Sequence, residues 1–414
     1  MQAEIIATGS ELTLGEQVDT NSPHIARKLR EIGLGSRFIT AVGDDEPALV
    51  EAVRIALSRS EVVVIGGGLG PTVDDVTRPA VARAVGRSLV FRPELLAQIA
   101  ARFKAYGRTM SDNNRQQAYV PEDAIPIENP VGTAPAFIVE HEGRAIACLP
   151  GVPREMMHLL DHAVLPYLAA KFDLREVILV RTLHTVGEGE SRIDQAIADL
   201  EQSANPVIGL SAKSGQVDVR ITSRAAGRDA AQKMIAEMET KVRERIDEHI
   251  FGADEQTLEG VIADLLANRH SALATVELNT GGAISSRLNA QDPSIRKAGQ
   301  VFQGGLVLSD ASSLPSTLNV DVRSAENLAM ITRAAQRIRA IHRTPLGLGA
   351  MLVDSGDGPS MRIYAALVSD AGAETLERSY GGHAGLAPQW TSSLALGMVW
   401  RFLTGASARR DGRA

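Results

Sequence analysis

The chain has 414 residues, which is longer than a single hydrophobic core usually supports, so two or three domains are expected. Its net charge is −7 and only 4% of its residues are aromatic, which argues against a broad nucleic-acid surface, because such surfaces gather basic and stacking side chains. A single cysteine, Cys148, excludes an intramolecular disulfide and fits a reducing compartment. Since we find no secretory leader and no apolar run of membrane-spanning length, we expect a cytoplasmic protein without a membrane segment.

The first 80 residues alternate short apolar runs with segments of helical periodicity. A strand is predicted at 5–7, and a helix begins at Ser22-Pro23, where a capping residue precedes a first-turn proline. Two further strands are expected at 37–42 and 62–65, with a helix between them. Because 62–65 is an unbroken β-branched run, that strand should be buried on both faces. This order predicts an α/β fold whose sheet is mostly parallel and flanked by helices.

The rest of the chain divides into a small middle module and a third α/β segment. A hairpin is predicted at 207–223, and a long helix from Arg228 to about His249 follows it. A later helix starts after Thr257 and leads into a strand at 272–276. The expected domains are 1–172, 173–253 and 254–403, and a flexible tail at 404–414 carries Arg409, Arg410 and Arg413.

Polar and glycine-rich segments follow each of the first three predicted strands. They are Gly9-Ser10-Glu11 with Asp19-Thr20-Asn21, then Gly43-Asp44-Asp45, and then the run from Gly67 to Thr77. Because ligands of open parallel sheets bind at the carboxyl ends of the strands, we expect these segments to converge in space.

The residue types in these segments suit phosphate and a hard metal ion. Gly67, Gly68 and Gly70 allow backbone N–H groups to approach a phosphate. The carboxylates of Asp44, Asp45, Asp74 and Asp75 suit Mg²⁺ or a similar divalent ion. The alternative is that Asp45 and Asp74 cap the helices that follow and that the glycines only make turns.

The stretch from Gly67 to Thr77 resembles the signature of the CinA (competence/damage-inducible) family, whose N-terminal domain has the molybdopterin-binding fold. The similarity extends over roughly residues 3–170, and one small departure is Ala136 in place of the usual glycine. The other matching motifs are Gly9-Ser10-Glu11-Leu12, Asp19-Thr20-Asn21, Gln117-Ala118, Asn129, Gly132-Thr133-Ala134-Pro135 and Leu149-Pro150-Gly151-Val152-Pro153-Arg154-Glu155-Met156.

The resemblance implies an ADP-ribose pyrophosphatase-like hydrolase with a divalent metal, in which Asp44 and Asp75 are the functional acids. The residues expected to bind substrate or phosphate are Gly9, Glu11, Asn21, Gly67, Gly68, Gly70, Thr72, Gly132 and Thr133. The expected metal ligands are Asp44, Asp45, Asp74 and Asp75.

The middle segment resembles the family's KH-like domain at Gly187, Glu190-Ser191 and Arg220. KH domains that bind RNA use a Gly-x-x-Gly loop, and the sequence of this segment contains none. A spacer or dimerisation role is therefore favoured over RNA binding, and a homodimer is expected because the family commonly forms dimers.

The third segment resembles the family's nicotinamide-nucleotide amidase domain, but without its reactive residues. The family's Glu-Ser-Cys-Thr-Gly-Gly motif reads Glu277-Leu278-Asn279-Thr280-Gly281-Gly282 here, so leucine replaces the nucleophilic serine. Phe302-Gln303-Gly304-Gly305 is kept, whereas Ser309 and Leu314 stand where the family has tyrosine and lysine. Residues 352–357 stand where the family has a Thr-Gly-Ile-Ala-Gly-Pro loop, and their sequence differs from it. This pattern implies a retained fold without amidase activity.

Two functions remain open from the sequence. One is metal-dependent hydrolysis of a nucleotide diphosphate such as ADP-ribose by the N-terminal domain. The other is a non-enzymatic pterin- or nucleotide-binding protein, or a scaffold linked to competence or the DNA-damage response.

Overall fold

The computed structural model describes residues 1–289, 301–320, 326–354 and 360–405, so most of the predicted tail and part of the 352–357 loop lie outside the described residues. Contacts divide the chain into two units, Met1–Leu179 with Ser223–Met234, and Val180–Thr222 with Ile235–Ala414. Each unit is described on its own below. Among the described residues, no helix combines the length and apolarity that crossing a bilayer requires.

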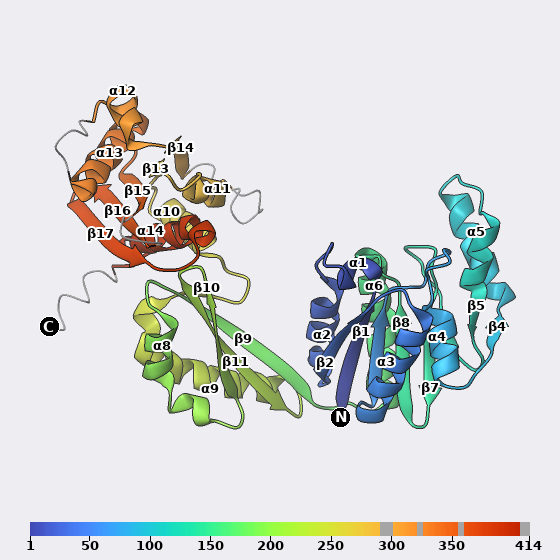
Figure 1. Ribbon diagram of the computed structural model, residues 1–414. Helices are drawn as coiled ribbons and strands as arrows, with labels where there is room; N and C mark the ends of the chain where they lie inside the picture. The colour runs from blue at the N-terminus through green and yellow to red at the C-terminus, as the bar shows by residue number, and fades with distance from the viewer. Residues whose placement is uncertain (290–300, 321–325, 355–359, 406–414) are drawn as a thin grey trace. The chain divides into compact units, whose positions relative to one another are not determined.

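A six-stranded sheet forms the centre of the N-terminal domain (Figure 1). Its strand order is β2 (Gly35–Val42), β1 (Gln2–Thr8), β3 (Val62–Gly66), β8 (Arg144–Leu149), β7 (Ala136–His141) and β6 (Ile125–Ile127). The first four strands run parallel, and β7 and β6 continue the sheet antiparallel. The predicted α/β fold with a mostly parallel sheet is confirmed.

Strand β3 is buried on both faces, as its sequence predicts. Val62 and Val64 belong to one apolar cluster with residues of α2 (Asn21–Glu31) and α6 (Pro153–Leu159). Val63 and Ile65 belong to another with residues of α3 (Glu46–Arg59) and α4 (Thr77–Ala84). Alternate residues thus bury against opposite helical layers. The domain's remaining elements are α1 (Ser10–Thr13), β4 (Leu89–Phe91), α5 (Pro93–Ala105), β5 (Tyr119–Pro121) and α7 (Leu165–Lys171).

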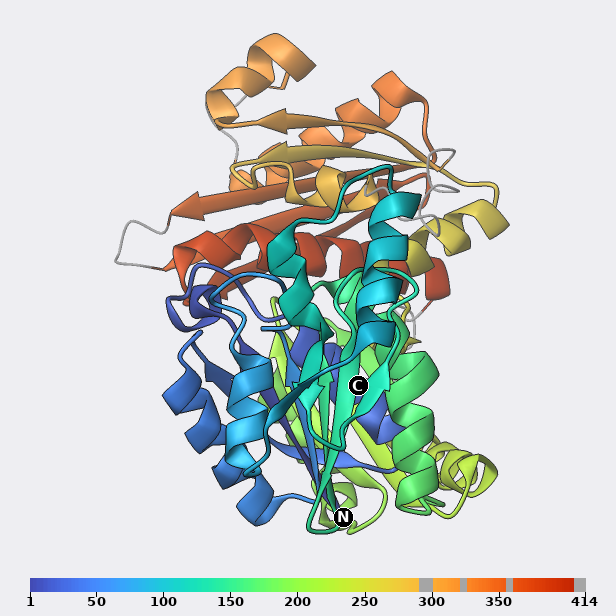
Figure 2. The same cartoon turned by 90° about the vertical axis from the view of Figure 1, so that its right-hand side faces the viewer.

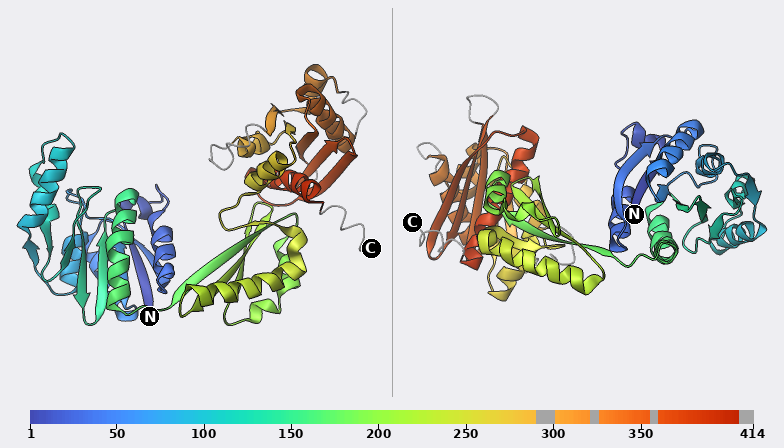
Figure 3. Two further views of the ribbon diagram at one scale, coloured as in Figure 1. Left: turned by 180° about the vertical axis from the view of Figure 1, so that it is seen from behind. Right: turned by 90° about the horizontal axis from the view of Figure 1, so that it is seen from below.

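The KH-like module contains a four-stranded sheet in the order β10 (Val207–Lys213), β11 (Gln216–Ala225), β9 (Val177–Val186), β12 (Ile250–Ala253). Strands β10 and β11 form the predicted hairpin, with Lys213 opposite Gln216 across the turn. Helix α8 (Glu190–Ile197) follows β9, and the long helix α9 (Arg228–Ile246) runs along the sheet (Figure 3).

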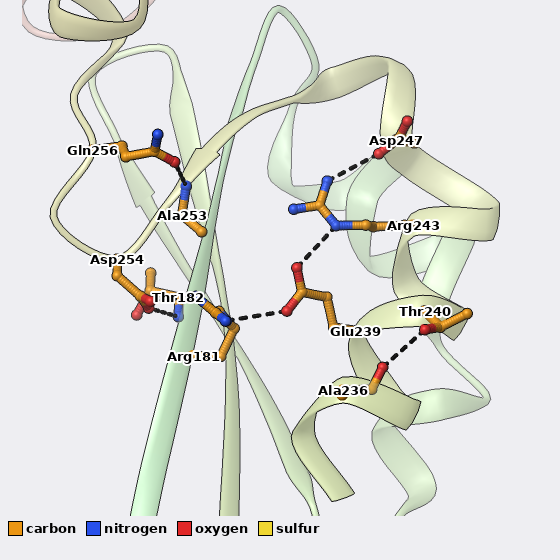
Figure 4. Close-up of polar contacts among 10 residues, drawn as sticks. All are labelled: Arg181, Thr182, Ala236, Glu239, Thr240, Arg243, Asp247, Ala253, Asp254 and Gln256. Atoms are coloured by element: carbon orange, nitrogen blue, oxygen red, sulfur yellow. Dashed lines mark hydrogen bonds and ion pairs between the residues drawn. The ribbon is translucent and has the colours of Figure 1, made fainter. Parts of the chain in front are cut away.

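A chain of alternating charges links three of these elements (Figure 4). Arg181 of β9 pairs with Glu239 of α9 at 3.0 Å and also with Asp254, which follows β12. Glu239 in turn accepts from Arg243 at 2.9 Å, and Arg243 pairs with Asp247 at 3.0 Å. Because each acid contacts a base, the network fixes the end of β12 against β9 and α9.

The third module is built on a five-stranded sheet in the order β14 (Phe302–Leu308), β13 (Leu273–Leu278), β15 (Leu346–Asp354), β16 (Met361–Ser369), β17 (Gly372–Tyr380). Helix α13 (Asn327–His342) packs with Tyr364 and Ala366 of β16, whereas α14 (Ala387–Thr404) packs with Ala365 and Leu367. The two helices therefore cover opposite faces of the sheet (Figure 2). The shorter helices are α10 (Leu258–Asn268), α11 (Ala283–Leu288) and α12 (Leu314–Leu318).

Glu277 is a fully buried carboxylate near the end of β13 that holds the start of α11. One oxygen accepts from Thr280 Oγ1 at 2.6 Å and Ile284 N at 2.9 Å, and the other accepts from Ser285 N at 2.8 Å and Ser285 Oγ at 2.7 Å. All four contacts are local, so this acid of the amidase-like motif has a structural role here.

We expect Glu277→Gln to destabilise the third module by about 3 kcal/mol, because an amide N–H₂ would face buried donors that lose their acceptor. Both tryptophans, Trp390 and Trp400, lie in this module, so their fluorescence during thermal unfolding of the full chain reports the change. Glu377→Gln, at an exposed ion pair with Arg362, is the control and should shift the midpoint little. Equal shifts for both variants would contradict the assignment.

Candidate active site

A cavity of about 430 Å³ lies at the carboxyl ends of β1 and β3, where the sequence predicts convergence. It brings together all of the predicted site residues except Asn21, Asp45 and Gly132. Those on its wall are Gly9, Glu11, Asp44, Gly67, Gly68, Gly70, Thr72, Asp74, Asp75 and Thr133.

The glycine-rich loop after β3 passes too close to its neighbours for side chains. Gly67 and Gly68 have φ values of +110° and +65°. A Cβ on Gly67 would lie 2.5 Å from Thr8 Oγ1, and one on Gly68 would lie 2.2 Å from Thr77 Oγ1. Thr77 Oγ1 also donates to Gly67 O at 2.8 Å. Glycine is therefore required at both positions, and the loop is packed tightly between β1 and α4.

Asp75 holds the outer part of the same loop. Its Oδ1 accepts from Gly70 N at 2.7 Å, and its Oδ2 accepts from Thr72 N at 2.7 Å and Thr72 Oγ1 at 2.6 Å. The structure thus gives Asp75 a loop-organising contact, and its predicted part in metal binding and catalysis stays a prediction.

Three other carboxylates face the cavity with few protein partners. Asp44 Oδ2 accepts from Ser10 N at 2.8 Å, while Ser10 Oγ accepts from Asp44 N at 3.1 Å. Glu11 and Asp74 make no side-chain hydrogen bond or ion pair with the described residues. Within that same part of the chain, no three His, Cys, Asp or Glu residues gather closely enough to hold a metal ion by themselves.

Asp45 and Asn21, two of the three predicted residues that lie off the cavity wall, make structural contacts instead. Asp45 is the N-cap of α3, and its Oδ1 accepts from Ala48 N at 2.8 Å, as the helix-cap alternative predicts. Asp74 does not cap, because α4 begins after Val76. Asn21 Nδ2 donates to Gly151 O at 2.7 Å and so positions a segment of the wall. Metal binding by Asp45 remains a prediction.

The cavity wall also contains Glu155, which sequence reasoning did not assign to the site. Asn129 Nδ2 donates to Glu155 Oε2 at 2.6 Å, and a Cβ on Gly132 would lie 1.9 Å from Glu155 Cδ. Burial raises the pKa of Glu155 above its ordinary value of 4.5, although the Asn129 hydrogen bond opposes the shift. Gly132 therefore serves the site indirectly, by leaving room for this carboxyl group.

Gln117 is a second residue that was not assigned to the site. It is 1% exposed, and its Nε2 donates to Leu69 O at 3.2 Å. Its Oε1 has no partner among the described residues. Both Glu155 and Gln117 lie in motifs that carry the family resemblance, which was the only sequence signal for them.

Comparisons with known proteins agree with this architecture. Residues 4–170 match the family model "Probable molybdopterin binding domain", and 180–252 match "Damage-inducible protein CinA KH domain". The chain thus combines a molybdopterin-binding-type domain with a CinA-type KH domain.

It belongs to the CinA family of competence-damage inducible proteins. A "Putative competence-damage inducible protein" of Acetivibrio thermocellus is 35% identical over 97% of this chain and 99% of the relative. One from Halothermothrix orenii is 34% identical with the same coverage. The crystal structure of CinA from Thermoplasma acidophilum is 38% identical and covers 40% of this chain and 96% of that chain, with a TM-score of 0.38.

The raised pKa of Glu155 predicts how stability changes with pH in Glu155→Gln. Ionising this half-buried acid costs free energy in the folded state, so the parent loses stability as pH rises from its unfolded pKa, near 4.5, through its higher folded pKa. The amide cannot ionise. The stability of Glu155→Gln relative to the parent should therefore increase over that pH window, measured by urea unfolding at several pH values. A pH-independent difference would show that the Glu155 pKa is not raised.

Proposed function

We propose that the N-terminal domain hydrolyses the diphosphate of a nucleotide such as ADP-ribose with the help of a divalent metal. The observation that carries this proposal is the convergence, in one cavity, of a tightly packed glycine loop with the sparsely paired carboxylates of Glu11, Asp44 and Asp74. Glycine backbones suit phosphate oxygens, and carboxylates suit a hard cation.

The electrostatics of the wall favour a cation between protein and substrate. Carboxylates and a diphosphate repel one another unless positive charge lies between them. Mg²⁺ typically takes one or two protein carboxylates and completes its shell with phosphate oxygens and water, which fits a wall with no preassembled metal group among the described residues. When bound, such an ion neutralises diphosphate charge and polarises water. Asp44, Glu11 and Asp74 are the residues that would hold it.

The reaction adds water across the phosphorus–oxygen bridge. A water oxygen bonds to one phosphorus, the bridging bond breaks, and two phosphate monoesters form, AMP and ribose 5-phosphate in the case of ADP-ribose. The loop from Gly67 to Thr72, held by Asp75, would bind the phosphates during this step. Glu155, whose pKa is raised by burial, can hold a proton at a higher pH than an exposed carboxyl group.

A second candidate function is non-enzymatic binding of a nucleotide or pterin. It is favoured by the same lack of a preassembled metal group in the described residues. In that case the cavity would bind the ligand without converting it. The other modules would then act as a scaffold in competence or the DNA-damage response. Turnover of ligand separates the two candidates.

The adjacent acids Asp44 and Asp45 provide a matched pair of variants. Asp44→Asn removes a carboxylate from the cavity wall, and we expect kcat/KM for ADP-ribose with Mg²⁺ to fall at least about 100-fold. Asp45→Asn replaces one good N-cap with another, so activity should stay within a few-fold of the parent. AMP release measured by chromatography gives both values. Equal losses would mean that Asp45 also binds the metal, and unchanged Asp44→Asn activity would remove Asp44 from the site.

We also propose that the third module has lost amidase activity. Leu278 is fully buried, in one apolar cluster with Leu314, which stands at the family's lysine position. Ser309, at the tyrosine position, is exposed. Within the described part of this module, the residues at these three family positions therefore offer neither a buried nucleophile nor a base to activate one.

We expect no ammonia release from nicotinamide mononucleotide, either by this protein or by Leu278→Ser. The introduced hydroxyl would lie in an apolar cluster without a base, and the lost packing should destabilise the module by about 3–5 kcal/mol. An enzyme-coupled ammonia assay, with circular dichroism to confirm folding, makes the measurement. Ammonia release by the parent protein that is lost on truncation after 253 would contradict the proposal.

A further inference from the structure

A second cavity, of about 510 Å³, lies between the KH-like module and the third module, inside the second unit. Its volume is within the range of small-molecule sites. One side is the loop at Gly187–Gly189 with the start of α8, and the other is formed by β16, β17 and α14. The modules share an apolar core here, because Val186 packs in one cluster with Ala395 and Val399. The cavity is thus part of one packed unit, and none of its lining residues belongs to the N-terminal site.

An aromatic wall lines one side of the cavity. The rings of Tyr380 and Trp390 lie 5.6 Å apart at an interplanar angle of 52°. Tyr380 donates its hydroxyl to His383 O at 3.0 Å, which fixes its ring. Trp390 packs against the hairpin turn, where a Cβ on Gly215 would come within 3.4 Å of its ring. The partly buried indole is therefore held in place and can stack on a flat ring.

Two arginines give the same cavity a positive rim. Arg378 of β17 makes no hydrogen bond or ion pair with the described residues. Its neighbour on β16, Arg362, is by contrast paired with Glu377 at 3.1 Å. The second rim cation, Arg192, contacts Glu188 at 3.3 Å but is 76% exposed, and a pair that exposed contributes little. The Arg378 guanidinium group is therefore available to an anion, for which its planar donors are well suited, whereas Arg192 would exchange its contact with Glu188 for one with the anion.

The loop beside these arginines passes close to α14. Gly187 has φ +86°, and a Cβ there would lie 2.4 Å from Arg401 Nη1. Gly189 is the N-cap of α8 and provides no capping side chain, and its carbonyl oxygen accepts from Arg192 N and Ile193 N at 3.1 Å.

We propose that this cavity binds a nucleoside monophosphate or a similar flat ring that carries one phosphate. The ring stacks on Trp390, and the phosphate pairs with Arg378 and Arg192. This ligand class follows from the combination of a fixed aromatic wall with the unpaired guanidinium group of Arg378, and it does not depend on hydrolysis in the N-terminal domain.

Tryptophan fluorescence of the full-length protein tests the site selectively. Residues 1–179 contain no tryptophan, and Trp400 is only 4% exposed, so quenching by ligand reports Trp390 even if the same ligand also binds the N-terminal domain. We expect AMP to quench saturably at micromolar to millimolar concentrations and adenosine to bind at least about tenfold more weakly. No saturable quenching by AMP, or equal affinity for adenosine, would overturn the proposal.

The matched variants are Arg378→Gln and Arg362→Gln on neighbouring strands. Both side chains are exposed, so both variants should fold. Arg378→Gln should raise the Kd for AMP about tenfold, the usual effect of losing one charge-assisted hydrogen bond. Arg362→Gln should leave the Kd within twofold. Equal effects of the two variants, or an unchanged Kd in Arg378→Gln, would show that AMP does not bind where the geometry places it.

Discussion

The carboxylate of Asp75 organises the loop on which the N-terminal site depends. It accepts hydrogen bonds from Gly70 and Thr72, which lie five and three residues earlier in the chain. Gly67 and Gly68 are in turn packed against Thr8 of β1 and Thr77 of α4. The loop is therefore fixed at both ends before any ligand binds. A ligand can therefore bind this loop without the entropic cost of ordering it.

The sheet places the other groups around this loop. Strands β1 and β3 are parallel neighbours, so the segments after them share one edge, and Asp44 reaches that edge from the end of β2. The resulting wall is acidic around Asp44, Glu11 and Asp74 and is formed by tightly packed glycine backbone along the loop. Such a surface suits a diphosphate only when a cation lies between the two charges. This electrostatic requirement connects the fold to the proposed metal-dependent hydrolysis.

The sequence predicts these features where the physical signal is local. The run at 62–65 correctly indicates a strand buried on both faces, and glycines and acids at strand ends correctly indicate convergence. The sequence alone cannot decide which of two adjacent acids faces the cavity. Asp44 and Asp45 have the same side chain, and only the backbone turn makes Asp45 the cap of α3. Nor does the sequence assign Glu155, whose place in the site depends on the long-range contact with Asn129 and Gly132.

Glu277 is the structural centre of the segment after β13. It anchors α11 through four buried hydrogen bonds, and the next residue, Leu278, lies in the apolar core. The buried donors need an acceptor, and this requirement holds whatever residue follows Glu277. The cavity at Trp390 and Arg378 lies between the KH-like module and the third module, and neither Glu277 nor Leu278 lines it.

The central claim is that the N-terminal cavity converts a nucleotide diphosphate. Phosphorus NMR of the full-length protein incubated with ADP-ribose and Mg²⁺, followed over time, tests it most directly. The diphosphate signals should disappear only when the metal is present, and two monoester signals should replace them in equal amounts. Diphosphate signals that persist with each of several divalent ions, while the protein still binds the compound, would contradict hydrolysis and leave a binding protein.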